Sequence, residues 1–220
     1  MARFILCIFV VSVSYCRCMG QWKYSDNMIN SRIEGQYLHP WQIEIAKKEH
    51  KNVLDYYLLL PKQLLIGELG ITDKRDTKEF RLNSIKQENP AYGRVNIKAG
   101  FLVASQDAFI KMALFKDRLN NRDILSIVLG CGEPPVQYCD FGFVVFDKSS
   151  LKWYVNKEVF PWKKFYAKCD SITSAYTGTE YFLPNIILPE FGTTISVIDA
   201  WNGENSVFKI DWTGKQFVVR

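Results

Sequence analysis

The sequence has few histidines and no signal for N-glycosylation. His39 and His50 are its only histidines, and both lie in the first quarter of the chain. A multi-histidine metal site lacks ligands, and a histidine-dependent catalytic triad has little material, since we interpret His39 as a strand-edge residue and not as a base. We predict no catalytic residues, no metal and no cofactor. No Asn-x-Ser/Thr acceptor occurs, and N-glycosylation is therefore not expected.

The sequence also lacks an apolar run long enough to cross a membrane. The longest such stretch, residues 4–13, falls well short of the roughly 20 residues that span a hydrocarbon core. It follows the cation Arg3 and precedes small and polar residues up to Cys18, an order typical of a secretory signal peptide. We predict a signal peptide at residues 1–18 and a secreted, extracellular protein without a membrane span. An uncleaved signal anchor is the alternative.

A strong charge of one sign is also missing. The formal net charge is +5, and it falls to +3 when Arg3 and Arg17 leave with the signal peptide. Lys and Arg are scattered among Asp and Glu, whereas nucleic-acid-binding proteins gather them in a patch or stripe. We therefore expect no nucleic-acid partner.

Six cysteines are present, and an oxidising compartment after export makes disulfides the expected state of those in the mature chain. Seven residues separate Cys131 from Cys139, a spacing that can close across a loop between two strands. Cys169 then either pairs with Cys18 or stays free. Cys18 belongs to the mature chain only if cleavage follows Cys16.

The best candidate boundary within the chain is NPAYG at residues 89–93, a turn-forming stretch that contains both a proline and a glycine. We therefore divide the mature chain into an N-terminal, β-containing part at 19–90 and a β-sandwich-like domain at 91–220. The second part is either separate from residues 39–90 or continuous with them.

Two stretches of the N-terminal part are apolar. Trp41, Ile43 and Ile45 alternate with polar residues, which predicts a half-buried strand. VLDYYLLL, residues 53–60, fits a buried strand and a short helix equally well.

Short β-like runs with frequent turns dominate the second part. Asn202-Gly203 stands between two such runs and predicts a tight hairpin, because Asn and Gly tolerate positive φ. A second turn at residues 213–215 extends this to an antiparallel meander. We predict a mainly β fold with little helix, an antiparallel β-sandwich or a jelly-roll-like arrangement. One segment departs from the pattern, because Ala108, Met112, Phe115 and Leu119 have helical spacing and favour a helix.

IVLGCG, residues 127–132, looks like the glycine-rich first motif of S-adenosylmethionine-dependent methyltransferases, with Asp147 in place of the acid that binds the ribose. A parallel crossover after this motif needs a helix and about a dozen residues or more. Only ten residues, two of them prolines, separate Gly132 from Phe143. We therefore favour a turn between two antiparallel strands.

A longer segment, residues 95–130, carries a different similarity. It contains an apolar strand at 101–104, then Asp107-Ala108, an alternating run at 109–114, a polar loop and a strand that ends in glycine at 130. In this order it resembles the domain named after farnesoic acid O-methyltransferase, found in animal proteins. The resemblance implies a β-sandwich-like module in which residues 105–121 form strand, loop and strand. It implies recognition of carbohydrate or other surface ligands and no methyltransferase activity.

Aromatic residues interleaved with lysines are the best candidates for ligand contact. WYVNKEVFPWKKFY, residues 153–166, suits stacking on sugar faces or contact with acidic surfaces. The alternative is that most of these rings fill the core. The predicted ligand-binding residues are Trp153, Tyr154, Trp162, Lys163, Trp201 and Trp212.

We expect a secreted protein that binds a carbohydrate or another extracellular ligand or protein and catalyses no reaction. A secreted hydrolase with paired carboxylates is the alternative, drawing on Glu133, Asp140, Asp147 and Asp170. Nothing in the sequence places two of these at a working separation. An S-adenosylmethionine-dependent methyltransferase is the third hypothesis.

Overall fold

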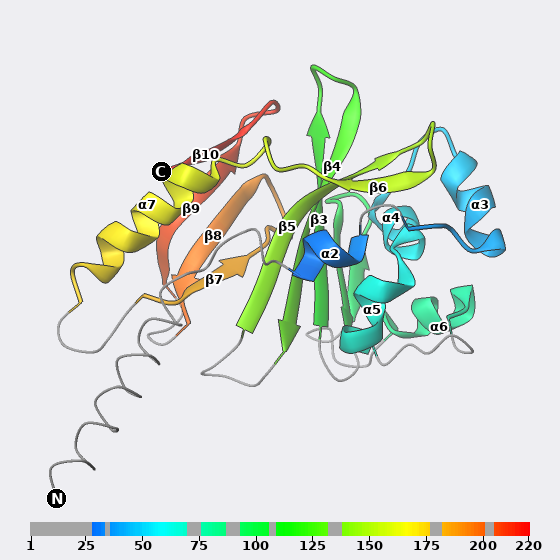
Figure 1. Cartoon of the computed structure of the whole chain (residues 1–220), viewed down its shortest axis with the longest axis horizontal. Helices are drawn as coiled ribbons and strands as arrows, with labels where there is room; N and C mark the ends of the chain where they lie inside the picture. The colour runs from blue at the N-terminus through cyan, green and yellow to red at the C-terminus, as the bar shows by residue number, and fades with distance from the viewer. Residues whose placement is uncertain are drawn as a thin grey trace, which may run out of the picture.

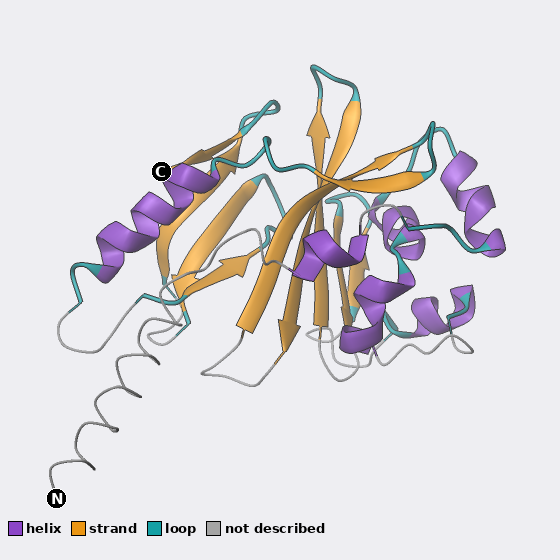
Figure 2. Cartoon of the chain, viewed as in Figure 1, coloured by secondary structure: helices purple, strands orange, loops and turns teal. Residues whose placement is uncertain are grey.

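Two antiparallel sheets and a set of short helices form three layers in the computed structural model (Figures 1 and 2). The six-stranded sheet lies in the middle, helices α2–α6 cover one face, and the four-stranded sheet with α7 covers the other. This confirms the prediction of a mainly antiparallel β fold. The structure describes residues 28–33, 36–69, 76–86, 93–105, 109–131, 138–176, 182–200 and 205–220.

Both sheets are meanders, since neighbouring strands follow each other along the chain. The C-terminal meander is thus confirmed, whereas the described strands do not show the crossing order of a jelly-roll. The six-stranded sheet consists of β1 Arg94–Asn96, β2 Phe101–Ser105, β3 Phe109–Asp117, β4 Arg122–Cys131, β5 Tyr138–Asp147 and β6 Lys152–Val155. The four-stranded sheet consists of β7 Pro184–Ile187, β8 Thr194–Asp199, β9 Ser206–Trp212 and β10 Phe217–Val219.

The six-stranded sheet is buried on both faces, because successive side chains of a strand point to opposite sides. Leu125 and Ile127 of β4 face the helices, while Ile124 and Val128 face the second sheet. Residues 124–130 are all buried, which explains why this strand is an almost unbroken apolar run.

Residues 109–117 form the strand β3, so the helix favoured by their spacing is wrong. Met112 belongs to the core under the helices and Phe115 to the core under the second sheet. Because β3 buries side chains on both faces, its apolar residues do not alternate cleanly and match a helical spacing by accident. Of the range 105–121 for which the resemblance implied strand, loop and strand, the structure describes the strand β3 and the turn at 118–121 that leads into β4.

The described part of the range 19–90 is helical and contains no strand, so the prediction of β structure there is wrong. The supposed strand through Trp41, Ile43 and Ile45 lies in α3. Pro40 occupies its first turn, where a missing N–H costs nothing, and the Gln42 side chain accepts a hydrogen bond from the His39 backbone N–H at 2.7 Å. The helices are α2 Met28–Ile33, α3 Pro40–Lys47, α4 Val53–Leu59, α5 Lys62–Leu69 and α6 Lys78–Asn83.

A buried arginine holds this helical layer together. The last carbonyl groups of a helix have no partner within it, and Nη1 of Arg81 donates to the carbonyls of Leu58 and Leu60, at 3.0 and 2.7 Å. Its Nε and Nη2 donate to the two carboxylate oxygens of Asp76, at 2.7 and 2.9 Å. The Trp153 indole of β6 donates to the intervening carbonyl of Leu59, at 2.9 Å. The end of α4 is thus tied to α6 and to the sheet.

The helix α7, Trp162–Thr173, was not predicted. Phe165 and Cys169, four residues apart, are buried against the second core, while Lys163, Lys164 and Lys168 face solvent. No helix in the described part of the chain is long and apolar enough to cross a membrane.

Arg81→Met should lower the free energy of unfolding by about 3–5 kcal/mol, because the buried Asp76 carboxylate loses its two-pronged charged partner and keeps, among the described residues, only His39 at 3.0 Å. The Leu58 and Leu60 carbonyls each lose one donor as well. Arg94→Met is the matched control, since Arg94 pairs with Glu190 at 2.8 Å with its side chain 42% exposed. It should cost less than about 1 kcal/mol. Urea unfolding curves measure both. Equal losses would contradict the role given to Arg81.

Candidate functional site

Two of the predicted ligand-binding tryptophans are core residues. Trp153 is 0% exposed, and its ring packs edge-on against Tyr56 and Phe146. Trp212 is 8% exposed, and its indole N–H donates to the Lys116 carbonyl at 3.2 Å. Both rings hold layers together, so we remove them from the set of ligand contacts.

The other predicted residues lie in different places. Trp162 is half-buried on α7 and stacks on Tyr166, while Lys163 beside it is exposed. Trp201 lies outside the described residues. Tyr154 of β6 is 45% exposed, the highest exposure among the predicted aromatic residues that the structure describes.

Tyr154 lines an open hollow of about 510 Å³ at the end of β5 and β6. In the β5–β6 ladder Phe146 pairs with Trp153 on the helix side, so the neighbouring pair Val145 and Tyr154 lies on the opposite face. There Val145 packs at the margin of the second core. We call this space the Tyr154 hollow, lined by Arg122, Val145, Tyr154, Val155, Asn156, Lys157 and Glu158.

Arg122 reaches the hollow from the β3–β4 hairpin, and Asp117 holds it there. Arg122 Nε donates to Oδ2 of Asp117 at 2.9 Å. The backbone and side-chain N–H groups of Asn120 donate to the same carboxylate at 3.2 and 2.7 Å, and Asn121 has the left-handed φ of 47° that the turn requires. Burial alone would raise the pKa of Asp117, but the hydrogen bonds from Asn120 and Arg122 outweigh it and hold the pKa below its usual value.

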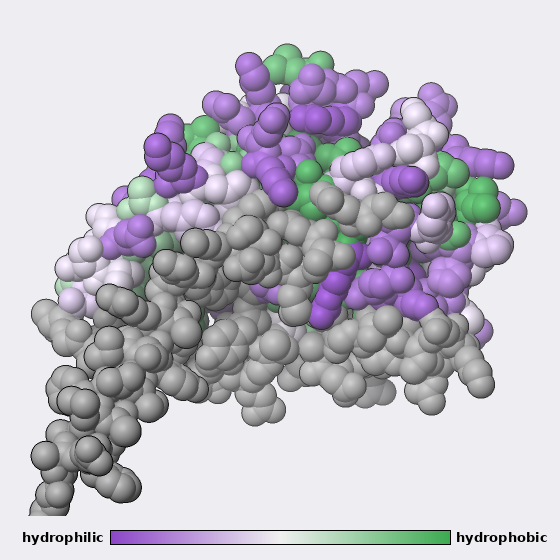
Figure 3. Space-filling model, viewed as in Figure 1, coloured by the Kyte–Doolittle hydropathy of each residue, from purple (hydrophilic) through white to green (hydrophobic). Residues whose placement is uncertain are grey.

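The hairpin is also fixed below its tip, on both faces of the sheet. On the helix side the Tyr56 hydroxyl donates to Asp123 at 2.8 Å, and burial together with this bond raises the pKa of Tyr56. On the other side Trp212 binds the Lys116 carbonyl. Figure 1 shows this hairpin rising above the rest of the molecule, and Figure 3 shows mainly hydrophilic surface around it. Arg122 is therefore presented on a rigid support.

Asn156 lies in the turn that follows β6. Its backbone N–H donates to the Phe143 carbonyl at 2.7 Å, and its Oδ1 accepts from the Val159 N–H at 3.2 Å. Its Nδ2 is buried and finds no hydrogen-bond partner among the described residues. A buried donor without a partner is costly, so this amide is the least satisfied polar group of the lining.

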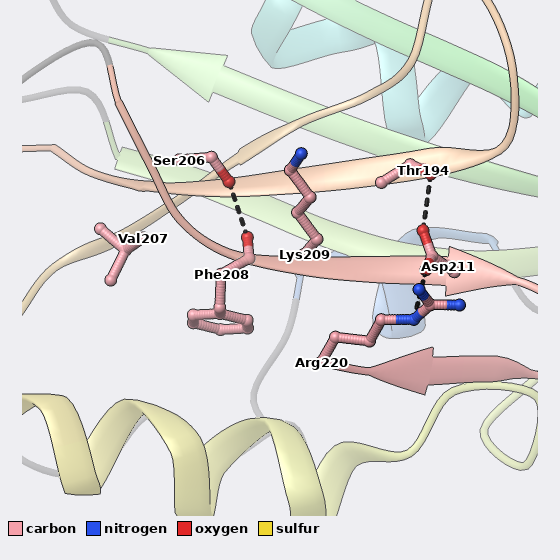
Figure 4. A pocket seen from close by; sticks show the side chains of 7 residues that line it. All are labelled: Thr194, Ser206, Val207, Phe208, Lys209, Asp211 and Arg220. Atoms are coloured by element: carbon pink, nitrogen blue, oxygen red, sulfur yellow. Dashed lines mark hydrogen bonds and ion pairs between the residues drawn. The ribbon is translucent and has the colours of Figure 1, made fainter.

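A second hollow, of about 600 Å³, lies on the four-stranded sheet (Figure 4). Asp211 in it accepts from Thr194 at 2.6 Å and pairs with Arg220 at 2.7 Å, and Ser206 donates to the Phe208 carbonyl at 2.9 Å. Figure 4 shows the Phe208 ring turned toward α7 and Lys209 pointing away from it. Phe208 is only 5% exposed, whereas Tyr154 is 45% exposed, so we favour the Tyr154 hollow.

The glycine-rich segment is part of an antiparallel pair, as predicted. Gly130 of β4 pairs with Cys139 of β5, and Cys131 pairs with Tyr138. A Cβ at Gly130 would lie 1.9 Å from the Phe109 ring, so glycine is needed there to let that ring cover the strand. The parallel crossover of a methyltransferase motif is absent at this place.

The disulfide between Cys131 and Cys139 remains a prediction. The register places Cys131 opposite Tyr138 and not opposite Cys139. Cys169 is free and 9% exposed, and Cys18 lies outside the described residues. Burial, followed by the nearby charge of Asp170, raises the pKa of the Cys169 thiol to about 12. The thiol is therefore protonated at neutral pH, which suits packing and not nucleophilic attack.

Among the carboxylates considered for hydrolysis, Asp140 and Asp147 lie seven residues apart on β5 and Asp170 lies on α7. Asp147 accepts from the backbone of Ser149 and from the hydroxyl of Ser150, which lowers its pKa and closes the β5–β6 turn. Asp170 is exposed on α7, and Glu133 lies outside the described residues. In the described ranges, no group of three or more His, Cys, Asp and Glu side chains could hold a metal ion.

Comparisons with protein-family models, with curated proteins and with solved structures find no match for this chain. The choice of candidate site therefore depends on the geometry of the residues alone. Sequence analysis identified Tyr154 but missed its partners Arg122, Asn156, Lys157 and Glu158. Residues 156–158 lie within the aromatic and lysine-rich stretch 153–166 that the sequence analysis identified. Nothing in the sequence linked Arg122 to that stretch.

Asp117→Asn should lower the free energy of unfolding by about 1–3 kcal/mol near neutral pH, because Arg122 and Asn120 lose a charged acceptor. The folded-state pKa of Asp117 is depressed, so its contribution is present above the unfolded-state pKa and is lost as pH falls through the folded-state value. Urea unfolding should therefore show a smaller difference between wild type and variant at about pH 3 than at about pH 7. Asp170→Asn removes the same charge from an exposed position and is the control. A difference in unfolding free energy between wild type and Asp117→Asn that does not change with pH would contradict the prediction.

Cys169 should resist alkylation by iodoacetamide in the folded protein and react once the protein is unfolded in urea, since its thiol is buried and protonated. Peptide mass mapping after labelling in each state measures this at Cys169 itself. Rapid labelling of the folded protein would contradict the burial of Cys169 on α7.

Proposed function

We propose that this is an exported binding protein without catalytic activity, and that it recognises a carbohydrate or another extracellular ligand at the Tyr154 hollow. The observation that carries the proposal is an exposed aromatic ring beside polar groups that lack partners. Ligand sites commonly combine an apolar or aromatic wall with a few well-placed polar groups. A sugar offers both an apolar face for the ring and hydroxyls for the polar groups.

The position of the Tyr154 side chain supports this role. Its hydroxyl lies 3.2 Å from Oγ of Ser150, which donates to Asp147 at 2.7 Å. The ring is therefore held at its far end while part of its surface stays open to solvent. A pre-positioned ring loses less conformational entropy when a ligand stacks on it.

The lining of the hollow favours binding over hydrolysis. Glycoside hydrolysis commonly uses two carboxyl groups facing one bond, roughly 5–10 Å apart. Glu158 is the one carboxylate among the lining residues, and Asp117 behind Arg122 already accepts three hydrogen bonds. The apolar segment at residues 4–13 supports the proposal of export.

A glycan array tests the proposal. We expect the protein to bind a subset of glycans, and Tyr154→Ser to weaken that binding at least about fivefold, since a ring contact contributes about 0.5–1.5 kcal/mol beyond its buried area. Tyr154→Phe keeps the ring and should retain most of the binding. Phe191→Ser, which removes a 74% exposed ring elsewhere, is the matched control. Binding that Phe191→Ser and Tyr154→Ser reduce equally, or a silent array, would refute the proposal.

A further inference from the structure

We infer that the ligand of the Tyr154 hollow is an acidic sugar, whose carboxylate or sulfate group binds Arg122 and Lys157 while the sugar ring contacts Tyr154. This inference rests on the proposed function and narrows its ligand class. Its basis is an imbalance in the lining, which carries two cations, Arg122 and Lys157, and one carboxylate, Glu158.

Arg122 is oriented to bind an oxyanion. Its Nε is engaged by Asp117, and no described residue binds its two terminal nitrogens. The side chain is 45% exposed, so these nitrogens are accessible. Two parallel N–H groups at the end of a fixed guanidinium match the two oxygens of a carboxylate or sulfate. The carboxylate that fixes Arg122 is 0% exposed in its side chain and fully engaged, so it does not compete for the ligand's position.

Lys157 adds a second cation to the hollow. It is exposed, and no carboxylate in the described part of the chain pairs with it. An acidic ligand supplies a counter-charge to Arg122 and Lys157, whereas a neutral sugar leaves both cations without one as the hollow loses water.

The second hollow has a similar charge pattern, since Arg220 Nε binds Asp211 as Arg122 Nε binds Asp117 and Lys209 adds a second cation. Its aromatic residue Phe208, however, is only 5% exposed. The ring of Tyr154 also favours a sugar acid over a small inorganic anion, because a bare sulfate or phosphate has no apolar face to place on it.

The test is calorimetric titration of the full chain with three hexasaccharides: one from heparin, one from hyaluronan and neutral maltohexaose. Heparin carries sulfate groups in addition to carboxylates, whereas hyaluronan carries carboxylates alone, so binding to heparin without binding to hyaluronan would identify sulfate as the group recognised. We expect at least one acidic probe to bind about tenfold or more tightly than maltohexaose, and its affinity to fall between about 50 mM and about 500 mM NaCl.

Arg122→Gln and Lys157→Gln should each weaken binding of the acidic probe about tenfold, since each removes a charged donor. Lys157→Gln breaks no contact among the described residues, so it remains informative if Arg122→Gln loosens the hairpin. Lys168→Gln, on the exposed face of α7, removes the same charge away from the hollow and should leave the affinity unchanged.

Three results would overturn the inference. Equal affinity for maltohexaose and the acidic probes would show a neutral-sugar site, and would leave the proposed function intact if Tyr154→Ser still weakens binding. A loss of affinity in Lys168→Gln as large as in Lys157→Gln would show nonspecific attraction. Absence of binding to all three probes would refute the acidic ligand, and the glycan array would decide the proposed function separately.

Discussion

The six-stranded sheet carries large apolar side chains on both faces, and a sheet of this kind is stable only when both faces are covered. Met112 and Leu125 require one layer, and Phe115 and Ile124 require another. The chain meets this constraint in order along its length. Helices that precede the sheet cover one face, and the four-stranded sheet and α7 that follow it cover the other.

The helical layer depends on a charged group that has no contact with solvent. Arg81 joins Asp76 to the end of α4, while Gln42 from α3 donates to the Leu58 carbonyl at 2.7 Å. These bonds satisfy carbonyls that would otherwise be buried without partners beneath the sheet. A polar network of this kind stabilises one arrangement of the helices over others, because any shift breaks several bonds together.

The proposed site lies at the margin of the second covering layer. Val145 is at the edge of the second core and Tyr154 beside it is open to solvent. The β3–β4 hairpin brings Arg122 to the same place, and its supports come from both layers through Tyr56 and Trp212. The geometry of the site is thus a consequence of how the layers hold the sheet, and Trp212, predicted to bind ligand, instead supports the hairpin that carries Arg122.

The sequence by itself determined the mainly β class, the C-terminal meander and the antiparallel pairing of the strands on either side of residues 132–137, because the short connections between β-like runs leave no room for crossover helices. It did not determine whether Trp41 and Met112 lie in helix or strand. Their spacing fits both, and the choice depends on which faces neighbouring layers bury. Only the tertiary structure decided that Trp153 is buried, that Tyr154 is exposed and that Arg122 lies beside it, because these depend on contacts between residues far apart in the chain.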